Sequence, residues 1–313
     1  MKKAIITGAT GFIGARLVNM LLDNDITVIG LGRKEWREID PNRLVPRDGF
    51  FYIRLPMDEL AELPLALKSN GCAGMDDTVF YNIAWSGSAG LSDLDVNGQM
   101  KNVAEACQAH SIANSLGCSK FVHVGTMEEP IAQNYLGLDY RTRNEFNRHV
   151  VYSLAKTASR NAIKANAYGK KISTIIATNS HVMGPHDYKD SFLQETLRKL
   201  KYKDSDLRFS TGEQFFDVIS VHDCAEAYML IGQHGKANSE YWIGSGSARP
   251  LREYVLEMEK LYPSDHELQF GEFSYNDISM QADDFSISLL QTHTGYAPKW
   301  SYERTVRELY EYL

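Results

Sequence analysis

Apolar positions in the first half of the chain form short, nearly continuous runs, separated by longer stretches with helical spacing. The runs that predict β-strands are Lys3–Thr7, Ile26–Leu31, Phe50–Arg54, Thr78–Ile83, Lys120–Val124 and Ile172–Ala177. Between them, Val96–Leu116 and Phe146–Tyr168 have the period of α-helices. Strands that are apolar throughout and alternate with helices are typical of a parallel sheet covered on both faces. The pattern therefore predicts an α/β fold with a doubly wound parallel sheet.

The pattern becomes less regular after about residue 177, where short strands and helices replace the alternation. Pro250 is suited to the first position of a helix that ends at Leu261. Ser301 is suited to cap a last helix that ends at Leu313. We expect a sheet domain over residues 1–177, completed by about 212–234, and a smaller C-terminal lobe over 178–211 and 235–313.

The first predicted strand runs directly into glycines that recur every three residues, and an amphipathic helix follows. A strand that turns through glycines into a helix presents backbone N–H groups and the positive helix end to a phosphate. The first glycine permits the turn, the second lets the backbone approach the ligand, and the third lets helix and strand pack closely. We therefore expect a dinucleotide site, made by Gly8, Thr10, Gly11, Phe12, Ile13 and Gly14.

The charge and composition of the chain bear on which classes of partner it can bind and in which compartment it lies. The net charge of −7 argues against nucleic acid or an anionic membrane as the main partner, so phosphates must be held by local features. The cysteines form no C-x-x-C pair, which favours a reducing compartment, and no apolar run reaches membrane-spanning length. We expect a cytoplasmic protein. His181 and His186 have no third ligand at coordinating spacing, so no metal is expected.

Candidate proton-transfer residues follow the fifth strand. Tyr152 and Lys156 are four residues apart and share a face of the predicted helix. A lysine ammonium beside a phenol favours the phenolate and lowers its pKa from about 10 toward neutrality. Such a tyrosine can exchange a proton with an alcohol or ketone oxygen, which Thr126 could also hold. In a chain with 17 tyrosines, about one Tyr-x-x-x-Lys is expected by chance, so the support comes from the order of the features.

That order carries a family resemblance. TGATGFIG, GT-M-E-E, YSLAK, HVMGP, FFDVISVHD and YWIGSG occur along the chain as they do in extended short-chain dehydrogenases/reductases. The chain resembles their nucleotide-sugar epimerase, dehydratase and ketoreductase branch over nearly its whole length. The resemblance implies a Rossmann sheet with a smaller C-terminal substrate-binding lobe. It also implies a homodimer, for which Val96–Leu116 and Phe146–Tyr168 are the candidate faces.

The resemblance also implies residue roles. Tyr152 would be the catalytic acid/base, Thr126 would orient the substrate oxygen, and Lys156 would hold the nicotinamide ribose and tune Tyr152. The glycines would carry the pyrophosphate, and the segment after the fourth strand would line the cofactor through Ala84. The side chains expected on the substrate side are Trp85, Ser86, Met127, Asn179, His181 and Phe216.

The end of the second strand bears on the choice of cofactor. An acidic residue there would accept hydrogen bonds from the adenosine ribose and select NAD. This chain instead has Gly32 followed by Arg33 and Lys34, which suits a 2′-phosphate. The alternative is that the two cations belong to an ordinary solvated loop. We favour NADP(H), which suits net reduction of a ketone.

Two departures from the family bear on the reaction. The 4,6-dehydratases that the chain resembles have Thr-Asp-Glu where it has Thr126, Met127 and Glu128, and methionine cannot donate the missing proton. Dehydration is therefore disfavoured, while Glu128 could serve as a base in an epimerisation or simply line the cleft. Phe216 stands where the family commonly has an arginine on the substrate diphosphate. Either the enzyme is divergent or its ketone carrier lacks a diphosphate; the candidate substitutes are Arg208, Arg249 and Arg252.

The sequence thus predicts an NADP(H)-dependent ketoreductase that acts on a nucleotide-linked 4-keto-6-deoxy sugar. An NAD(P)-dependent nucleotide-sugar epimerase that uses the same Tyr152 is the alternative enzyme. A dinucleotide-sensing regulator without turnover is the alternative of another class. Thr126, Tyr152 and Lys156 argue against the regulator, because a sensor needs no proton donor. The sugar, its nucleotide and the stereochemistry of reduction stay open.

Overall fold

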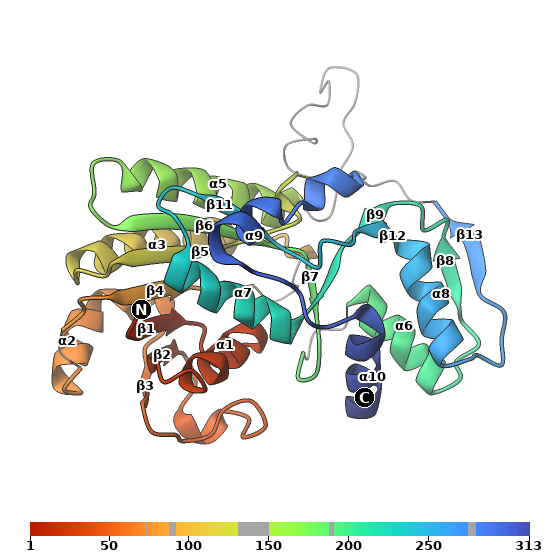
Figure 1. Ribbon diagram of the computed structural model, residues 1–313, viewed down its shortest axis with the longest axis horizontal. Coiled ribbons are helices and arrows are strands. Elements are labelled where there is room, and N and C mark those ends of the chain that lie inside the picture. Colours follow the sequence, from red (N-terminus) through yellow and green to blue (C-terminus); the bar gives the residue numbers. More distant parts are fainter. Residues whose placement is uncertain (73, 88–91, 131–149, 188–190, 275–279) are drawn as a thin grey trace, which may run out of the picture.

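The computed structural model describes residues 1–72, 74–87, 92–130, 150–187, 191–274 and 280–313 of the 313-residue chain (Figure 1). Within these ranges, seven parallel strands form one sheet in the order β11-β6-β5-β4-β1-β2-β3. Its strands are β1 (Lys3–Thr7), β2 (Thr27–Gly32), β3 (Phe50–Arg54), β4 (Thr78–Asn82), β5 (Lys120–Thr126), β6 (Ser173–Asn179) and β11 (Glu240–Ile243). The predicted doubly wound Rossmann sheet is confirmed.

Helices cover both faces of the sheet. One face is covered by α1 (Phe12–Leu22) and α7 (Val221–His234), and the other by α2 (Leu63–Ser69), α3 (Val96–Ser115) and α5 (Val150–Ala167). Neighbouring strand residues point to opposite faces, so Ile6 packs in the core with α1 while Ile5 packs in the core with α3. Both side chains have no exposed surface. Burial on two faces explains why the strands lack polar alternation.

A smaller lobe lies beside the sheet (Figure 1). It has its own apolar core, which includes Leu197, Met258 and Leu309. Its helices and paired strands are α6 (Phe192–Lys201), α8 (Leu251–Leu261), α10 (Tyr302–Tyr312), β8 (Arg208–Ser210) with β13 (Gln269–Phe273), β9 (Phe215–Phe216) with β12 (Arg249–Pro250), and β7 (His181–Met183) with β10 (Val218–Ser220). Short 3-10 helices lie at η1 (Trp36–Glu38), η2 (Met57–Glu62) and η4 (Ala282–Phe285).

Two predicted helix starts can be compared with the structure. The Ser301 hydroxyl accepts a hydrogen bond from the Arg304 N–H at 3.2 Å, so Ser301 caps α10 as expected. Pro250 was expected as the first helical residue, but it is the N-cap of α8, which begins at Leu251. The predicted start of the helix before Tyr152, at Phe146, lies outside the described residues.

The predicted division of the chain needs one correction. Residues 235–313 were assigned to the smaller lobe, but β11 in that range is the edge strand of the main sheet and pairs in parallel with β6. The following helix α9 (Ser288–Thr294) also belongs with the sheet, since Leu290 and Tyr296 are buried in the same core as α1 and α7. The chain therefore crosses from the lobe region back to the sheet, which a four-residue strand does not reveal in the sequence.

The register of the sheet gathers the candidate residues. Thr7 stands beside Asn82, Asn82 beside His123, and Thr126 beside Asn179. The carboxyl ends of these parallel strands meet at one edge, where α/β proteins bind ligands. The glycine turn, the segment after β4 and the segment after β5 therefore lie next to one another.

Helices α3 and α5 pack against each other on one face of the sheet. They remain the predicted interface of a homodimer. Of the helices in the described ranges, none combines the length and the apolar character needed to cross a bilayer.

Candidate active site

The glycine turn has no room for side chains at its two ends. Gly8 has a φ of +70°, and a Cβ there would lie 3.0 Å from the Ala84 backbone. A Cβ on Gly14 would lie 2.1 Å from the Gly8 carbonyl oxygen. Helix α1 begins just after Gly11, so the N–H groups at its start lack intrahelical partners. This cradle has the free N–H groups that the predicted pyrophosphate site requires.

The segment after β4 is held beside this turn by Thr7. The Thr7 hydroxyl accepts hydrogen bonds from the N–H groups of Ile83 and Ala84, at 3.1 and 3.2 Å. It donates to the Asn82 amide oxygen at 2.9 Å. Gly8 and Ala84, both predicted to contact the cofactor, are therefore brought together by a buried threonine that the sequence did not indicate.

The end of β2 lies against the same turn. A Cβ on Gly32 would meet the Tyr52 hydroxyl at 2.7 Å and the Thr10 methyl group at 3.3 Å. Arg33 and Lys34 follow as exposed residues, and neither forms an ion pair within the described part of the chain. The two exposed cations directly follow Gly32, which itself lies against Thr10 of the turn.

Arg43 contacts the turn from a direction that sequence reasoning missed. Its guanidinium donates to the Thr10 carbonyl oxygen at 3.1 Å and also to the carbonyl oxygen of His186. It therefore joins the glycine turn to the segment after β7. Arg43 lies between η1 and β3, and no motif in the sequence points to it.

The candidate proton-transfer residues meet around an indole ring. The Lys156 Nζ lies 3.9 Å from the centroid of the Trp85 ring and 5.9 Å from that of Tyr152. The Trp85 and Tyr152 rings meet edge to face, with centroids 6.3 Å apart. Thr126, at the end of β5, is the side chain beside the Tyr152 hydroxyl. The structure therefore brings Thr126, Tyr152, Lys156 and Trp85 into one place.

The expected lowering of the tyrosine pKa is wrong for this structure. Burial raises the pKa of Tyr152, an effect that the Thr126 hydrogen bond opposes and the charges of Glu128 and Glu129 reinforce. The lysine ammonium points to the Val124 carbonyl oxygen, 3.3 Å away, and to the indole face rather than to the phenol oxygen. Tyr152 is therefore a neutral phenol near pH 7, the form that can donate a proton.

The pKa of Lys156 is shifted in the opposite direction to that of Tyr152. Its side chain is buried, with a relative exposure of 3%, and burial lowers its pKa to about 7, while the charge of Glu129 raises it. The group therefore changes charge in the physiological range. Its position over Trp85 adds a cation–π contact to the protonated form.

The residues beside Thr126 differ in how their polar atoms are used. The Glu128 N–H donates to the Thr126 hydroxyl at 3.3 Å, and the Glu128 residue is almost wholly buried. The Met127 N–H donates to the Asn179 carbonyl oxygen at 3.0 Å. The Asn179 amide oxygen accepts from the Tyr228 hydroxyl at 2.9 Å, inside the protein. That contact engages the amide oxygen of Asn179, which was predicted to face the substrate.

Trp85 and Ser86 are fixed by α3. The Trp85 indole N–H donates to the Gln99 amide oxygen at 2.9 Å. The Ser86 backbone exchanges two hydrogen bonds with the Asn102 side chain, at 2.9 and 2.7 Å, while Ser86 itself is exposed. The sequence named both residues but did not predict these supports.

An aromatic pair occupies the position where the resembled family commonly has an arginine. The rings of His181 and Phe216 are 5.3 Å apart and tilted by 41°. Burial lowers the pKa of His181 to about 4, so the ring is neutral at physiological pH. His186, by contrast, packs on the Tyr312 ring with centroids 4.6 Å apart, so the two histidines contact different aromatic residues.

The proposed arginine substitutes already have partners. Arg249 lies opposite Phe216 in the β9–β12 pair, but it pairs with Glu257 and stacks over the Tyr254 ring at 4.2 Å. Arg208 pairs with Asp206 at 2.7 Å. Arg252 stacks over the Phe270 ring at 4.3 Å. None of the three is therefore free to take the place of the family arginine without losing these contacts.

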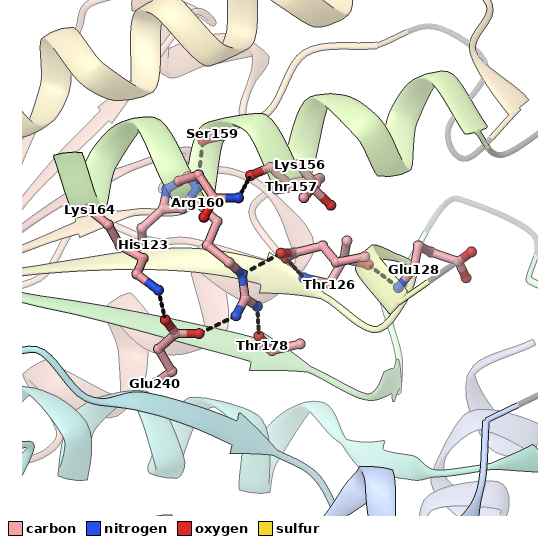
Figure 2. Close-up of polar contacts among 12 residues, drawn as sticks. His123, Thr126, Glu128, Lys156, Thr157, Ser159, Arg160, Lys164, Thr178 and Glu240 are labelled. Carbon is pink, nitrogen blue, oxygen red and sulfur yellow. Dashed lines mark hydrogen bonds and ion pairs between the residues drawn. The ribbon is translucent and has the colours of Figure 1, made fainter. Parts of the chain in front are cut away.

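A buried histidine links the strand before the glycine turn to helix α5, which carries Tyr152 and Lys156. His123 Nδ1 lies 3.1 Å from the Asn82 amide nitrogen. Its Nε2 lies 2.9 Å from the Ser159 hydroxyl (Figure 2). Because the Asn82 oxygen accepts from Thr7, its NH₂ group donates to Nδ1, and the Nε2–H donates to Ser159. Burial lowers the pKa of His123, which keeps the ring neutral. The link joins β1, β4, β5 and α5.

Comparison with known proteins agrees with this arrangement. The model of the NAD dependent epimerase/dehydratase family matches residues 4–244. The chain belongs to this family. It is 24% identical to dTDP-6-deoxy-L-talose 4-dehydrogenase (NAD(P)(+)) of Kitasatospora kifunensis, over 98% of this chain and 94% of that protein. It is 26% identical to CDP-abequose synthase of Salmonella typhimurium over 141 residues, which are 42% of this chain and 46% of that enzyme.

Solved structures share the fold. UDP-glucose 4-epimerase of Thermotoga maritima matches with a TM-score of 0.77 and 16% identity, over 99% of this chain and 98% of that one. UDP-glucuronic acid 4-epimerase of Bacillus cereus, in complex with UDP-glucuronic acid and NAD, matches with a TM-score of 0.74 and 18% identity, over 99% and 98%. The family is therefore one of NAD-dependent enzymes whose named relatives modify nucleotide sugars.

Proposed function

We propose that this protein is an NADP(H)-dependent ketoreductase that acts on a nucleotide-linked 4-keto-6-deoxy sugar. The observation that carries the proposal is the buried, neutral Tyr152 phenol beside Thr126, at the edge of the sheet where the glycine turn lies. A similar protein over almost the whole chain is named as a 4-dehydrogenase of a 6-deoxy sugar nucleotide. The experiment that tests the proposal is stoichiometric consumption of NADPH with a 4-keto-6-deoxy sugar nucleotide.

In the proposed reaction, the bound cofactor supplies the hydride that reduces the carbonyl carbon. Thr126 and Tyr152 hold the carbonyl oxygen, and Tyr152 transfers its phenolic proton to that oxygen. The protonated Lys156, whose Nζ lies 5.9 Å from the centroid of the Tyr152 ring, offsets the negative charge of the phenolate across this distance, and it exists in this form below its pKa of about 7. The Trp85 ring, packed against both side chains, keeps water from them.

An epimerase is the second candidate, favoured by the position of Glu128. Its backbone N–H donates to the Thr126 hydroxyl, so a carboxylate residue directly neighbours the side chain proposed to hold the substrate oxygen. An epimerase would interconvert isomers without net change in cofactor. Formation of an isomer from the sugar nucleotide, with the NADPH concentration constant, would replace the reductase proposal.

The preference for NADP(H) gives a direct test at Arg33. Arg33→Ala removes a charge-assisted hydrogen bond to the 2′-phosphate, which contributes about 1.5–3 kcal/mol. We expect KM for NADPH to rise roughly 10–100-fold while KM for NADH stays within about twofold. Arg37→Ala, an exposed arginine on η1, is the matched control and should change neither value. A wild-type preference for NADH of more than about tenfold would contradict the assignment of Arg33.

Phe216 tests how the substrate is held. Phe216→Arg introduces a guanidinium beside His181, where a diphosphate could make charge-assisted hydrogen bonds. If the substrate diphosphate passes this point, we expect the inhibition constants of UDP, CDP and dTDP to fall about tenfold, with NADPH binding unchanged. Equal inhibition of the variant and the wild-type enzyme would show that the diphosphate is held elsewhere.

A further inference from the structure

A carboxylate after β5 is anchored to the catalytic helix. One oxygen of Glu129 accepts a hydrogen bond from the Thr126 N–H at 2.9 Å. The other oxygen pairs with Arg160 on α5, which also donates to the Thr178 hydroxyl at 2.6 Å and pairs with Glu240 on β11 (Figure 2). One partly buried guanidinium fork therefore joins the ends of strands β5 and β6, strand β11 and helix α5.

The site of this carboxylate is shaped by a glycine. Glu129 has a relative exposure of 4%. A Cβ on Gly125 would lie 2.7 Å from the Glu129 Oε1 and 2.8 Å from the Thr178 hydroxyl. The absence of that carbon lets the carboxylate lie directly against β5. A buried carboxylate is stable only with such partners, because desolvation of an unpaired charge is costly.

Arg160 follows Lys156 by four residues, so the two lie one turn apart on the same side of α5. The pair of Glu129 and Arg160 thus connects the helix that carries Tyr152 and Lys156 to the strand end that carries Thr126. A change in the pair would move these groups relative to each other. In proton transfer, displacements of an ångström are costly.

We propose that Glu129, seated by Arg160 one helical turn from Lys156, is a positioning residue that holds Thr126 in register with Tyr152 and Lys156 and fixes a negative charge on the side of α5 that carries Lys156. This inference rests on the proposed reductase chemistry for its meaning in catalysis. The placement of Glu129 between the Thr126 N–H and Arg160 carries it.

The charged groups around Lys156 determine whether its pKa is raised or lowered. Burial lowers the pKa of Lys156, and the negative charge of Glu129 opposes that lowering. His123 faces Lys156 from β5 but is neutral, because burial lowers its pKa. Arg160 is the cation one turn along α5 and pairs with Glu129. Beyond it, Glu240 on β11 pairs with Lys164 at 2.6 Å, which balances the outer end.

Two substitutions should shift the pKa of Lys156 in opposite directions. Glu129→Gln keeps the size and the acceptor for Thr126 but removes the negative charge, so the pKa of Lys156 should fall. Arg160→Met removes the cation and leaves Glu129 uncompensated, so the pKa of Lys156 should rise. A shift of one unit in either direction is a tenfold change in proton affinity. If Glu129 and Arg160 had only a structural role, both variants would be less stable, and the pKa of Lys156 would not shift in opposite directions.

The measurement is an NMR titration of protein labelled with [¹³Cε]lysine, in which the Lys156 signal is assigned by its loss in Lys156→Met. It needs no turnover, so it decides this inference even if the wild-type protein reduces no keto sugar. With an active enzyme, the high-pH limb of kcat should move to lower pH in Glu129→Gln and to higher pH in Arg160→Met. KM for NADPH should stay within about twofold.

Glu303→Gln and Arg307→Met are matched controls, because they remove an exposed pair on α10 whose atoms are 2.8 Å apart. They should leave the pKa of Lys156 and kcat unchanged. Folding of each variant is checked by circular dichroism and by NADPH binding. If the pKa of Lys156 is unmoved, or moves the same way in the folded Glu129 and Arg160 variants, the inference is wrong.

Arg160→Lys tests the proposal if Glu129→Gln and Arg160→Met do not fold. It keeps the cation but loses the planar fork that reaches Glu129, Thr178 and Glu240 together. We expect the pKa of Lys156 to be retained while kcat falls about tenfold with KM unchanged. An unchanged kcat would overturn the positioning role.

Discussion

Tyr152→Phe is expected to abolish reduction of the keto sugar, with kcat lowered by about 10³-fold or more. The substitution removes only the hydroxyl, so the ring can keep its edge contact with Trp85 and the fold should be retained. In the native structure, burial keeps this phenol protonated, and Thr126 lies beside its hydroxyl. Single-turnover reduction with NADPH measures the chemical step, and fluorescence titration with NADPH measures binding, which should change by less than about twofold.

Tyr168→Phe is the matched control for this result. Tyr168 lies just beyond the end of α5, with a relative exposure of 92%, so its hydroxyl faces solvent. We expect the control to retain wild-type kcat and cofactor binding. Turnover by Tyr152→Phe at the wild-type rate would sink the assignment of Tyr152 as the acid. Unchanged NADPH binding together with lost turnover in Tyr152→Phe would also argue against a sensor, which needs no proton donor.

The second large effect is expected at the glycine turn. Gly14→Ala adds a carbon that would lie 2.1 Å from the carbonyl oxygen of Gly8 and 2.9 Å from its carbonyl carbon. Backbone atoms cannot move aside as a flexible side chain can, so the turn must shift as a whole. Overpacking of this kind costs about 1–3 kcal/mol of stability. Because the displaced N–H groups are those that would hold the pyrophosphate, NADPH affinity should fall by about 100-fold or more.

Gly295→Ala separates the two consequences of Gly14→Ala. Gly295 has a φ of +72° after α9, and a Cβ there would meet no atom within 4 Å. The left-handed backbone makes alanine cost about 1–2 kcal/mol at this position. Thermal unfolding should therefore report similar losses for both variants, while isothermal calorimetry with NADPH should report lost binding for Gly14→Ala alone. Full NADPH affinity in folded Gly14→Ala would contradict the role assigned to the turn.

The chemistry of the candidate site follows from burial more than from charge pairing. Spacing on a helix suggested that Lys156 would lower the pKa of Tyr152. In the folded chain both side chains are desolvated, so each group is shifted toward its neutral form: the tyrosine pKa rises and the lysine pKa falls. The neutral phenol suits proton donation to a ketone, which is the direction of the proposed reduction. The desolvation of Lys156 also makes Glu129 important, because the negative charge of Glu129 opposes the fall in the Lys156 pKa.

Much of this protein could be predicted from local patterns. The strand Lys3–Thr7, the glycine turn and the helix after it are contiguous, so their geometry depends on backbone sterics within a few residues. Continuous apolar strands that alternate with helices specified the parallel sheet, because both faces of such strands are buried. The spacing of Tyr152 and Lys156 placed them on one helix face, again a local property.

Only the tertiary structure decided the features that depend on contacts between distant segments. The return of β11 to the sheet, the contact of Arg43 with Thr10, and the pairing of Glu129 with Arg160 join residues with no periodic relation in the chain. The direction of the Tyr152 pKa shift also depends on the tertiary structure, because desolvation of the phenol depends on all the atoms packed around it. Sequence spacing shows which groups can meet along one helix or strand. Burial and long-range packing determine how those groups are charged once they have met.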